Sequence, residues 1–202
     1  MLEASIKAGV KHFIYISSAA VYGDPQYLPI DEERPLKPKS PYGASKLAGE
    51  EHTNSFQAHG VKTTVLRLFN VYGPGQNPSY AGVITKFQQR IKEGKPPIIL
   101  GSGEQTRDFI HVDDVSEANK KVLEAEAQGV FNIASGKPVT INSLAKTMMN
   151  LAGLNLKPKY APPRLGDIEQ SYANISKAVR LLKWRPETEL EDGLKHLINS
   201  NT

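Results

Sequence analysis

Apolar residues in this chain fall into short continuous runs that alternate with stretches of helical spacing. The run at 12–17 (HFIYIS) is typical of a parallel strand buried on both faces, and the run at 62–70 (KTTVLRLFN) predicts a second strand. Between them, Ser40 and Pro41 predict the start of a helix that continues to about residue 60, because serine caps helices well and proline suits their first position.

The same alternation continues to the end of the chain. We expect the chain to open in a helix that stops at Gly9 and to close on an amphipathic helix from about Leu190. The other predicted strands are 97–100, 107–112 and 130–134, and the other predicted helices are 80–93, 113–127, 144–151 and 176–183. Strands and helices in alternation predict an α/β fold with a mostly parallel sheet, and the more irregular second half predicts a smaller lobe.

Composition places the chain among ordinary globular proteins. Its 202 residues are 39% hydrophobic and 23% charged, which allows a real core and is far from the composition of disordered chains. The net charge of +4 is spread along the sequence without a basic run interleaved with aromatics, so we expect no nucleic-acid surface. No apolar run approaches the length of a membrane span, and the first residues lack the basic start of a signal peptide.

The reactive residue types narrow the chemistry further. Cysteine is absent, which excludes disulfides and thiolate nucleophiles and fits a reducing cytoplasm. The five histidines show no pairing at metal-ligand spacing, so we predict no metal site. His111 is predicted to help cap the helix that follows it, and the helix dipole favours Asp113 and Asp114 in its first turn.

One spacing in the helix after Ser40 carries chemical information. Tyr42 and Lys46 are four residues apart and so share a face of the helix, which can bring the ammonium close to the phenol. A nearby cation favours the phenolate, which can take a proton from a sugar hydroxyl while hydride leaves the same carbon. Tyrosine and lysine at this spacing also occur by chance on many surface helices, so the pair is informative only in its context.

Two strand ends supply that context. The strand at 12–17 is followed by Ser18, and the strand at 62–70 ends in Asn70 before a turn rich in glycine and proline. Ligands of open α/β sheets bind at the carboxyl ends of the strands, where both residues fall. The alternative for the serine is that it only caps the strand end.

Five segments, in order, resemble the NAD-dependent epimerase/dehydratase family of extended short-chain dehydrogenases, and most of all its UDP-glucose 4-epimerase group. They are SSAAVYG from Ser17, SPYGASK from Ser40, RLFNVYGPGQ from Arg67, GSGEQTRDFIHVDDV from Gly101 and RLGD from Arg164. The resemblance covers essentially the whole chain. It implies a Rossmann-like, doubly wound parallel sheet at 1–75 and 105–135 and a smaller α/β substrate lobe at 76–104 and 136–202.

The resemblance also implies a role for each matching residue. Tyr42 is expected to be the catalytic base, Lys46 to assist it and hold the nicotinamide ribose of NAD, and Ser18 to hydrogen-bond the reacting hydroxyl. The backbone at Leu68 is expected to face the nicotinamide. A UDP-sugar substrate is expected to contact Asn70 with its diphosphate-sugar, Leu100 with its uracil, Arg107 and Arg164 with its pyrophosphate, Asp167 with its ribose and Ser171 with the sugar's 2-substituent.

Plain structural roles remain as alternatives for some of these residues. For the two arginines the alternative is a solvent-facing charge, and Ser171 is alternatively a small residue that opens the following strand. For the full-length protein the resemblance implies a homodimer.

Ala19 and Ala20 bear on the type of reaction. Family members that eliminate water carry acidic residues in this segment, and alanine cannot replace an acid in that chemistry. We therefore expect epimerisation of a UDP-hexose at C4 through a 4-keto sugar, with another family reaction such as dehydration or reduction as an alternative. The sugar stays open among glucose or galactose, their N-acetyl forms and the uronic acids.

The glycine-rich turn with which family members open does not occur in this sequence. Neither does the acidic residue about 20 positions beyond it that holds the adenosine ribose. At about 30 residues per βαβ step, roughly 100 residues of the dinucleotide-binding fold are expected to be missing. We therefore expect this chain alone not to hold NAD stably, and a catalytically incompetent fragment or a nucleotide-sugar-binding remnant stays an alternative.

Overall fold

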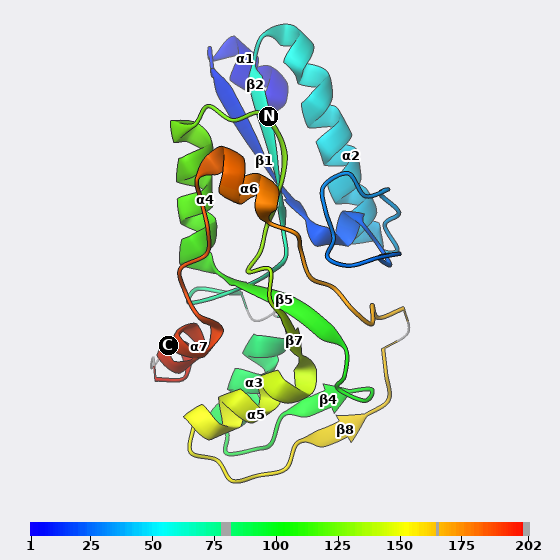
Figure 1. Ribbon diagram of the computed structural model, residues 1–202, viewed down its shortest axis with the longest axis vertical. Coiled ribbons are helices and arrows are strands. Elements are labelled where there is room, and N and C mark those ends of the chain that lie inside the picture. The colour runs from blue at the N-terminus through cyan, green and yellow to red at the C-terminus, as the bar shows by residue number, and fades with distance from the viewer. Residues whose placement is uncertain (78–81, 165, 200–202) are drawn as a thin grey trace.

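A three-stranded parallel sheet forms the half of the molecule drawn at the top of Figure 1. This computed structural model describes residues 1–77, 82–164 and 166–199. The strands run in the order β1–β2–β6 and are β1 (His12–Ser18), β2 (Lys62–Leu68) and β6 (Gly129–Ile133). Ser18 pairs with Leu68, and Leu68 with Ile133, so the carboxyl ends of the three strands lie side by side near the middle of the molecule.

Helices cover both faces of this sheet. On one face lies α2 (Pro41–Ser55), and on the other lie α4 (Val112–Glu124) and α6 (Ser176–Leu182). Successive residues of β2 point to opposite faces, so Leu66 packs in the core with α4 and α6 while Arg67 reaches α2. The result is the Rossmann-like, doubly wound arrangement that the sequence predicts. A short helix, α1 (Leu2–Lys7), precedes the first strand.

Two smaller sheets form the other half of the molecule. The strand β5 (Thr106–His111) pairs in parallel with β3 (Asn70–Tyr72) and antiparallel with β7 (Pro138–Thr140), while β4 (Ile98–Leu100) pairs with β8 (Lys159–Ala161). Three helices pack around a shared apolar core with these strands, and they are α3 (Val83–Lys92), α5 (Ile141–Leu151) and α7 (Leu190–Asn199). The described residues also include 3-10 turns at Ala19–Val21 and Phe56–His59.

Several local predictions are confirmed. The Ser40 hydroxyl accepts from the Gly43 amide at 3.1 Å, with Pro41 in the first position of α2. His111 caps α4, its Nδ1 accepting from the Asp113 amide at 3.3 Å. Both caps satisfy backbone N–H groups that have no partner inside a helix.

Other predictions are wrong in detail. The strand predicted at 62–70 breaks at Phe69, because Asn70 starts β3 in a different sheet. The strand at 12–17 is mostly half-buried rather than buried on both faces, because β1 lies at the edge of the described sheet. The sequence did not predict β7 or β8, which are three residues each and lie in polar or proline-containing stretches. Residues 80 and 81 of the helix predicted at 80–93 lie outside the described residues.

The segment around α6 shows how closely the two halves are interwoven. The sequence placed it in the substrate lobe, yet Leu182 and Trp184 pack with α4 and β6 in the half that holds the parallel sheet.

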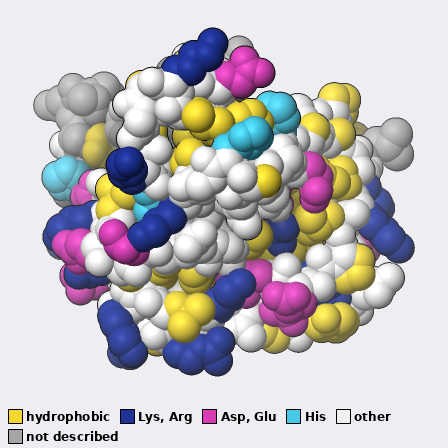
Figure 2. Space-filling model, turned by 90° about the horizontal axis from the view of Figure 1, so that it is seen from above, with side chains coloured by type: hydrophobic (Ala, Val, Ile, Leu, Met, Phe, Trp, Pro, Cys, Tyr) yellow, Lys and Arg dark blue, Asp and Glu magenta, His cyan; other side chains and the backbone are white. Residues whose placement is uncertain are grey.

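Seen from the end of the molecule that carries α1, lysine and arginine side chains lie at several separate places, with acidic side chains beside many of them (Figure 2). None of the helices within the described residues combines the length and apolarity needed to cross a membrane.

Candidate active site

The first turns of α2 lie directly against the carboxyl end of β1. Lys46 donates from Nζ to the Ile16 carbonyl at 2.9 Å, and its Nζ lies 5.8 Å from the centroid of the Tyr42 ring. Gly43 allows this approach, because a Cβ there would lie 2.6 Å from the Ala20 carbonyl oxygen. Tyr42 is 56% exposed, so this residue is accessible from the solvent. The structure therefore brings tyrosine and lysine together at the strand end, as the four-residue spacing predicts.

Ser18 completes this group, and its hydroxyl has two possible uses. It accepts a hydrogen bond from the Ala20 amide at 3.2 Å, which caps the 3-10 turn after β1. This is the capping role that the sequence allowed. The hydroxyl proton stays available for donation to a ligand, because the capping bond uses only a lone pair of the oxygen. Capping and ligand binding are thus compatible at Ser18.

A cleft of about 550 Å³ lies in the other half of the molecule. It gathers five of the residues predicted to bind a nucleotide sugar, which are Asn70, Leu100, Arg107, Arg164 and Asp167. A smaller hollow of about 390 Å³ shares Leu100, Arg164 and Asp167 with it. The predicted substrate residues come from four separate stretches of sequence, so their convergence is a property of the fold.

Positive charge dominates the cleft. Among the described residues that line it, four are cationic and one is acidic: Lys86, Arg90, Arg107 and Arg164 against Asp167. Lys86 and Arg90 come from α3 and were not predicted. Their spacing of four residues on an amphipathic helix is the signal that could have found them. A concave site with this charge suits an anionic ligand.

Arg107 is already partly engaged. Its Nη2 donates to Asp167 Oδ1 at 2.5 Å, and its Nη1 donates to the carbonyls of Thr106 at 2.8 Å and Ile168 at 2.7 Å. The sequence predicted separate roles for Arg107 and Asp167, so their pairing is new. Of the five N–H groups of a guanidinium, these bonds use three and leave two for a ligand.

Asn70 contacts the backbone of Asp108, whose carboxylate is buried. Asn70 donates to the Asp108 carbonyl at 2.9 Å, and the Asp108 carboxylate accepts from the amides of Ser135, Gly136 and Ala173 at 2.7–3.1 Å. Burial raises the pKa of Asp108 against the effect of these donors. Ser171 is 8% exposed and does not line the cleft, so its role beside the sugar stays a prediction.

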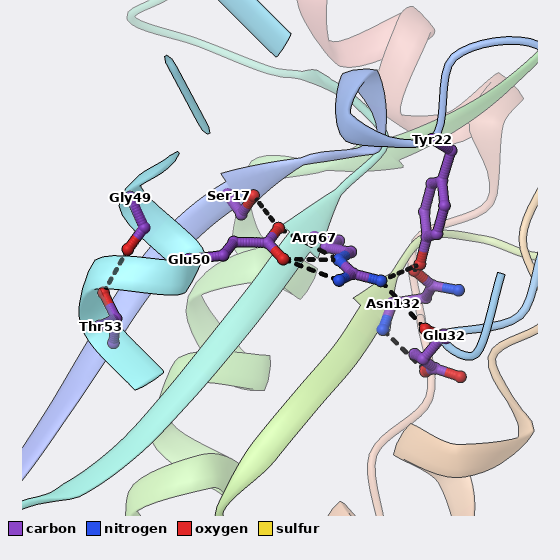
Figure 3. Close-up of polar contacts among 8 residues, drawn as sticks. All are labelled: Ser17, Tyr22, Glu32, Gly49, Glu50, Thr53, Arg67 and Asn132. Carbon is purple, nitrogen blue, oxygen red and sulfur yellow. Dashed lines mark hydrogen bonds and ion pairs between the residues drawn. The ribbon is translucent and has the colours of Figure 1, made fainter. Parts of the chain in front are cut away.

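A buried polar cluster between α2 and the parallel sheet is a further feature that the sequence did not predict (Figure 3). Its centre is the ion pair between Glu50 and Arg67, with Nη2 and Oε2 2.7 Å apart. Arg67 is a lone cation inside the apolar run TVLRLF, and Glu50 follows Lys46 by four residues. The cation within an apolar run and the acidic residue four positions after Lys46 are the features of the sequence from which this ion pair could have been suspected. Within the described residues, no group of three His, Asp or Glu side chains could hold a metal ion.

The fold is that of one class of protein. The chain belongs to the NAD dependent epimerase/dehydratase family, whose model matches residues 1–134. It is similar to a UDP-glucose 4-epimerase from Thermotoga maritima solved with UDP-glucose, with 40% identity and a TM-score of 0.91 over 98% of this chain and 65% of that one.

Other relatives show a similar match. A UDP-N-acetylglucosamine 4-epimerase from Methanobrevibacter ruminantium M1, in complex with UDP-N-acetylmuramic acid, is 38% identical, with a TM-score of 0.92 over 97% of this chain and 64% of that one. A putative UDP-glucose 4-epimerase from Methanocaldococcus jannaschii is 39% identical over 98% of this chain and 66% of its own length. The chain thus spans slightly less than two thirds of these relatives.

Proposed function

We propose that this chain carries the catalytic group and the substrate cleft of an NAD-dependent UDP-hexose 4-epimerase that acts through a 4-keto sugar. The observation that carries the proposal is the cationic cleft, which is lined by Asn70. A single residue separates Asn70 from Leu68, the last residue of β2. A ligand held in the cleft by its diphosphate can therefore extend towards the strand ends beside Tyr42, Lys46 and Ser18.

The cleft supplies binding. Arg107 and Arg164 hold the pyrophosphate, because guanidinium groups form strong charge-assisted hydrogen bonds with phosphate oxygens. Leu100 offers apolar surface to the uracil, and Asp167 offers a carboxylate to the ribose hydroxyls. Asn70 hydrogen-bonds the diphosphate-sugar. Anchoring at the nucleotide leaves the hexose free to turn over, so either of its faces can be presented to the catalytic group.

The group on α2 supplies proton transfer. Tyr42 takes the proton of the sugar's 4-hydroxyl and later returns it, which is general base and then general acid catalysis. Lys46 stabilises the phenolate through its positive charge, and Ser18 donates to the reacting oxygen. Ala19 and Ala20 form the turn beside this group and offer no acid for the elimination of water.

The residues present fit the nicotinamide half of NAD. The paired ends of β1, β2 and β6 form the edge at which cofactors bind in open α/β sheets. Lys46 can donate to a ribose hydroxyl there, the Tyr42 oxygen can accept from one, and the backbone at Leu68 would face the ring. NAD, when bound, accepts the hydride from C4 and returns it.

Replacement of Tyr42 by Phe tests this proposal. In the full-length protein, we expect Tyr42→Phe to lower kcat by about 10²–10⁴-fold, the usual contribution of a general base, with little change in UDP-sugar affinity. Tyr27→Phe is the matched control, because Tyr27 is also 56% exposed and lies outside the cleft. Turnover of UDP-glucose and UDP-N-acetylglucosamine is followed by chromatography, and affinity by calorimetry.

Two outcomes would argue against the proposal. Retention of more than about a tenth of the activity would remove Tyr42 from the role of general base. UDP-sugar binding without turnover in the unmodified protein would favour a nucleotide-sugar-binding remnant instead.

A further inference from the structure

The proposed mechanism assigns no role to the buried polar cluster in Figure 3. The Glu50 carboxylate accepts from the Ser17 hydroxyl and from Nε and Nη2 of Arg67, the latter at 2.7 Å. Glu50 is 1% exposed and Arg67 is 4% exposed. Burial opposes the charge on Arg67, but its bonds to Glu50 and Tyr22 outweigh this effect and raise its pKa, so Arg67 stays charged.

The cluster extends across the sheet to β6. Arg67 Nη1 donates to the Tyr22 hydroxyl at 3.0 Å and to the Glu32 carbonyl at 3.1 Å. The Tyr22 hydroxyl donates in turn to Asn132 Oδ1 at 2.6 Å. Burial raises the pKa of Tyr22 to about 12, so this hydroxyl keeps its proton and the direction of the bonds is fixed. Arg67 is thus held from two sides, by Glu50 on α2 and by Tyr22.

Each central member of the cluster is a close neighbour of a residue in the proposed catalytic group. Ser17 precedes Ser18 and Arg67 precedes Leu68, both at the carboxyl ends of their strands. Glu50 follows Lys46 by four residues, and Lys46 follows Tyr42 by four, so all three lie along one side of α2. A shift of α2 along the sheet would move Tyr42 and Lys46 away from Ser18 and Leu68.

Close packing makes the position of α2 sensitive to this anchor. Gly49, beside Glu50, lies directly against the Tyr15 ring of β1, and a Cβ at this position would collide with the Tyr15 hydroxyl. Apolar surfaces alone allow neighbouring elements to slide, whereas a bidentate ion pair has one favourable geometry. The contact at Gly49 sets the distance between α2 and the sheet, and the bonds of Glu50 set its position along the strands.

We propose that Glu50 and Arg67 are positioning residues for the reaction, which fix α2 on the ends of β1 and β2 so that Tyr42 and Lys46 meet the sugar's reacting hydroxyl. This inference rests on the proposed function. Its physical basis is that a misplacement of about 1 Å at a reacting group can reduce the rate by about 10²-fold. Binding of the nucleotide is affected little, because the residues that line the cleft come from other elements.

The test compares Glu50→Gln with Asp114→Asn in the full-length protein. Asp114 is also a buried carboxylate that accepts two hydrogen bonds, from the amides of Glu187 and Thr188, but it lies on α4. We expect Glu50→Gln to lower kcat by about 30–100-fold with KM for UDP-glucose changed less than about threefold. Asp114→Asn should lower stability without this selective loss of kcat.

A milder variant and a second measurement keep the test decisive. Ser17→Ala removes one donor to Glu50 and should lower kcat by about threefold to tenfold, which decides the matter if Glu50→Gln does not fold. Hydrogen exchange should show faster exchange of the α2 amides in Glu50→Gln and Ser17→Ala, but not in Asp114→Asn. If the unmodified protein turns over no UDP-sugar, the proposed function fails, while hydrogen exchange still reports whether Glu50 anchors α2.

Three results would overturn the inference. The first is a kcat for Glu50→Gln or Ser17→Ala equal to that of the unmodified protein. The second is a loss of kcat that only follows the folded fraction, as in Asp114→Asn. The third is unchanged exchange in α2.

Discussion

The two halves of this molecule each contain an arginine–carboxylate pair, and the pairs differ in their access to water. In the pair of Arg67 and Glu50 the side chains are 5% and 2% exposed, whereas in the pair of Arg107 and Asp167 they are 16% and 37% exposed. The first pair joins a helix to a sheet inside the protein. The second borders the cationic cleft, where solvent and ligands can reach it.

This difference shows how one kind of ion pair can serve two purposes. A sealed pair has no water or ligand with which to exchange, so it holds its two elements in one arrangement, and loss of one member leaves an uncompensated charge in the interior. An open pair contributes little to stability, because water competes for both groups. Arg107 can therefore direct its two remaining N–H groups to a phosphate, or exchange Asp167 for one, at small energetic cost.

The largest expected effect separates the two pairs by stability. Arg67→Met should lower the free energy of unfolding by about 3–5 kcal/mol, because Glu50 would remain buried without its partner. Asp167→Asn should lower it by less than about 1 kcal/mol, since its pair with Arg107 is open to solvent. Urea unfolding of the two variants and the unmodified chain measures both values. Equal losses would contradict the distinction between a sealed and an open pair.

The next effect separates the pairs by ligand binding. Arg107→Gln should weaken UDP binding by about 10–100-fold, the loss expected when charged hydrogen bonds to a diphosphate disappear. Lys120→Gln on the outer surface of α4 removes the same charge and should leave the affinity within about twofold, because solvent screens a distant exposed charge. Calorimetric titration with UDP at low and moderate salt measures the effect. Equal weakening by both variants would indicate attraction by net charge alone.

The sequence predicted the cleft better than it predicted the anchor of α2. Tyr42 and Lys46 could be found because their relation is local, four residues along one helix, and the cap at Ser40 is equally local. The resemblance to a known family supplied the cleft residues Asn70, Arg107 and Arg164, which no local pattern would have brought together.

The pairing of Glu50 with Arg67 depends on where α2 crosses the sheet, which spacing along the chain does not determine. The same reason explains the missed break at Phe69. Apolar character continues from β2 into β3, and only the packing of the second half shows that Asn70 leaves the first sheet. Short strands such as β7 and β8 are defined by their partners and carry little signal of their own.

The smallest expected effect concerns His12, a partly buried histidine on β1. Its Nε2 lies 2.7 Å from the Thr64 hydroxyl, which itself donates to the Ala127 carbonyl. The hydroxyl must then accept from Nε2–H of His12. Burial, followed by the nearby charge of Lys62, lowers the pKa of His12 below its ordinary value of 6.5.

The sign of the pH dependence follows from this direction. The unfolded chain binds the His12 proton at a higher pH than the folded chain does, so the contribution of His12 is complete above pH 6.5 and is lost as the pH falls towards the folded pKa. Glutamine at position 12 keeps an N–H donor for Thr64 but does not titrate. His12→Gln should therefore lose less stability than the unmodified chain between about pH 7.5 and about pH 5.5 in urea unfolding. Because every other titratable group is the same in both proteins, the difference between the two slopes isolates His12, and identical slopes would show that its burial has no energetic consequence.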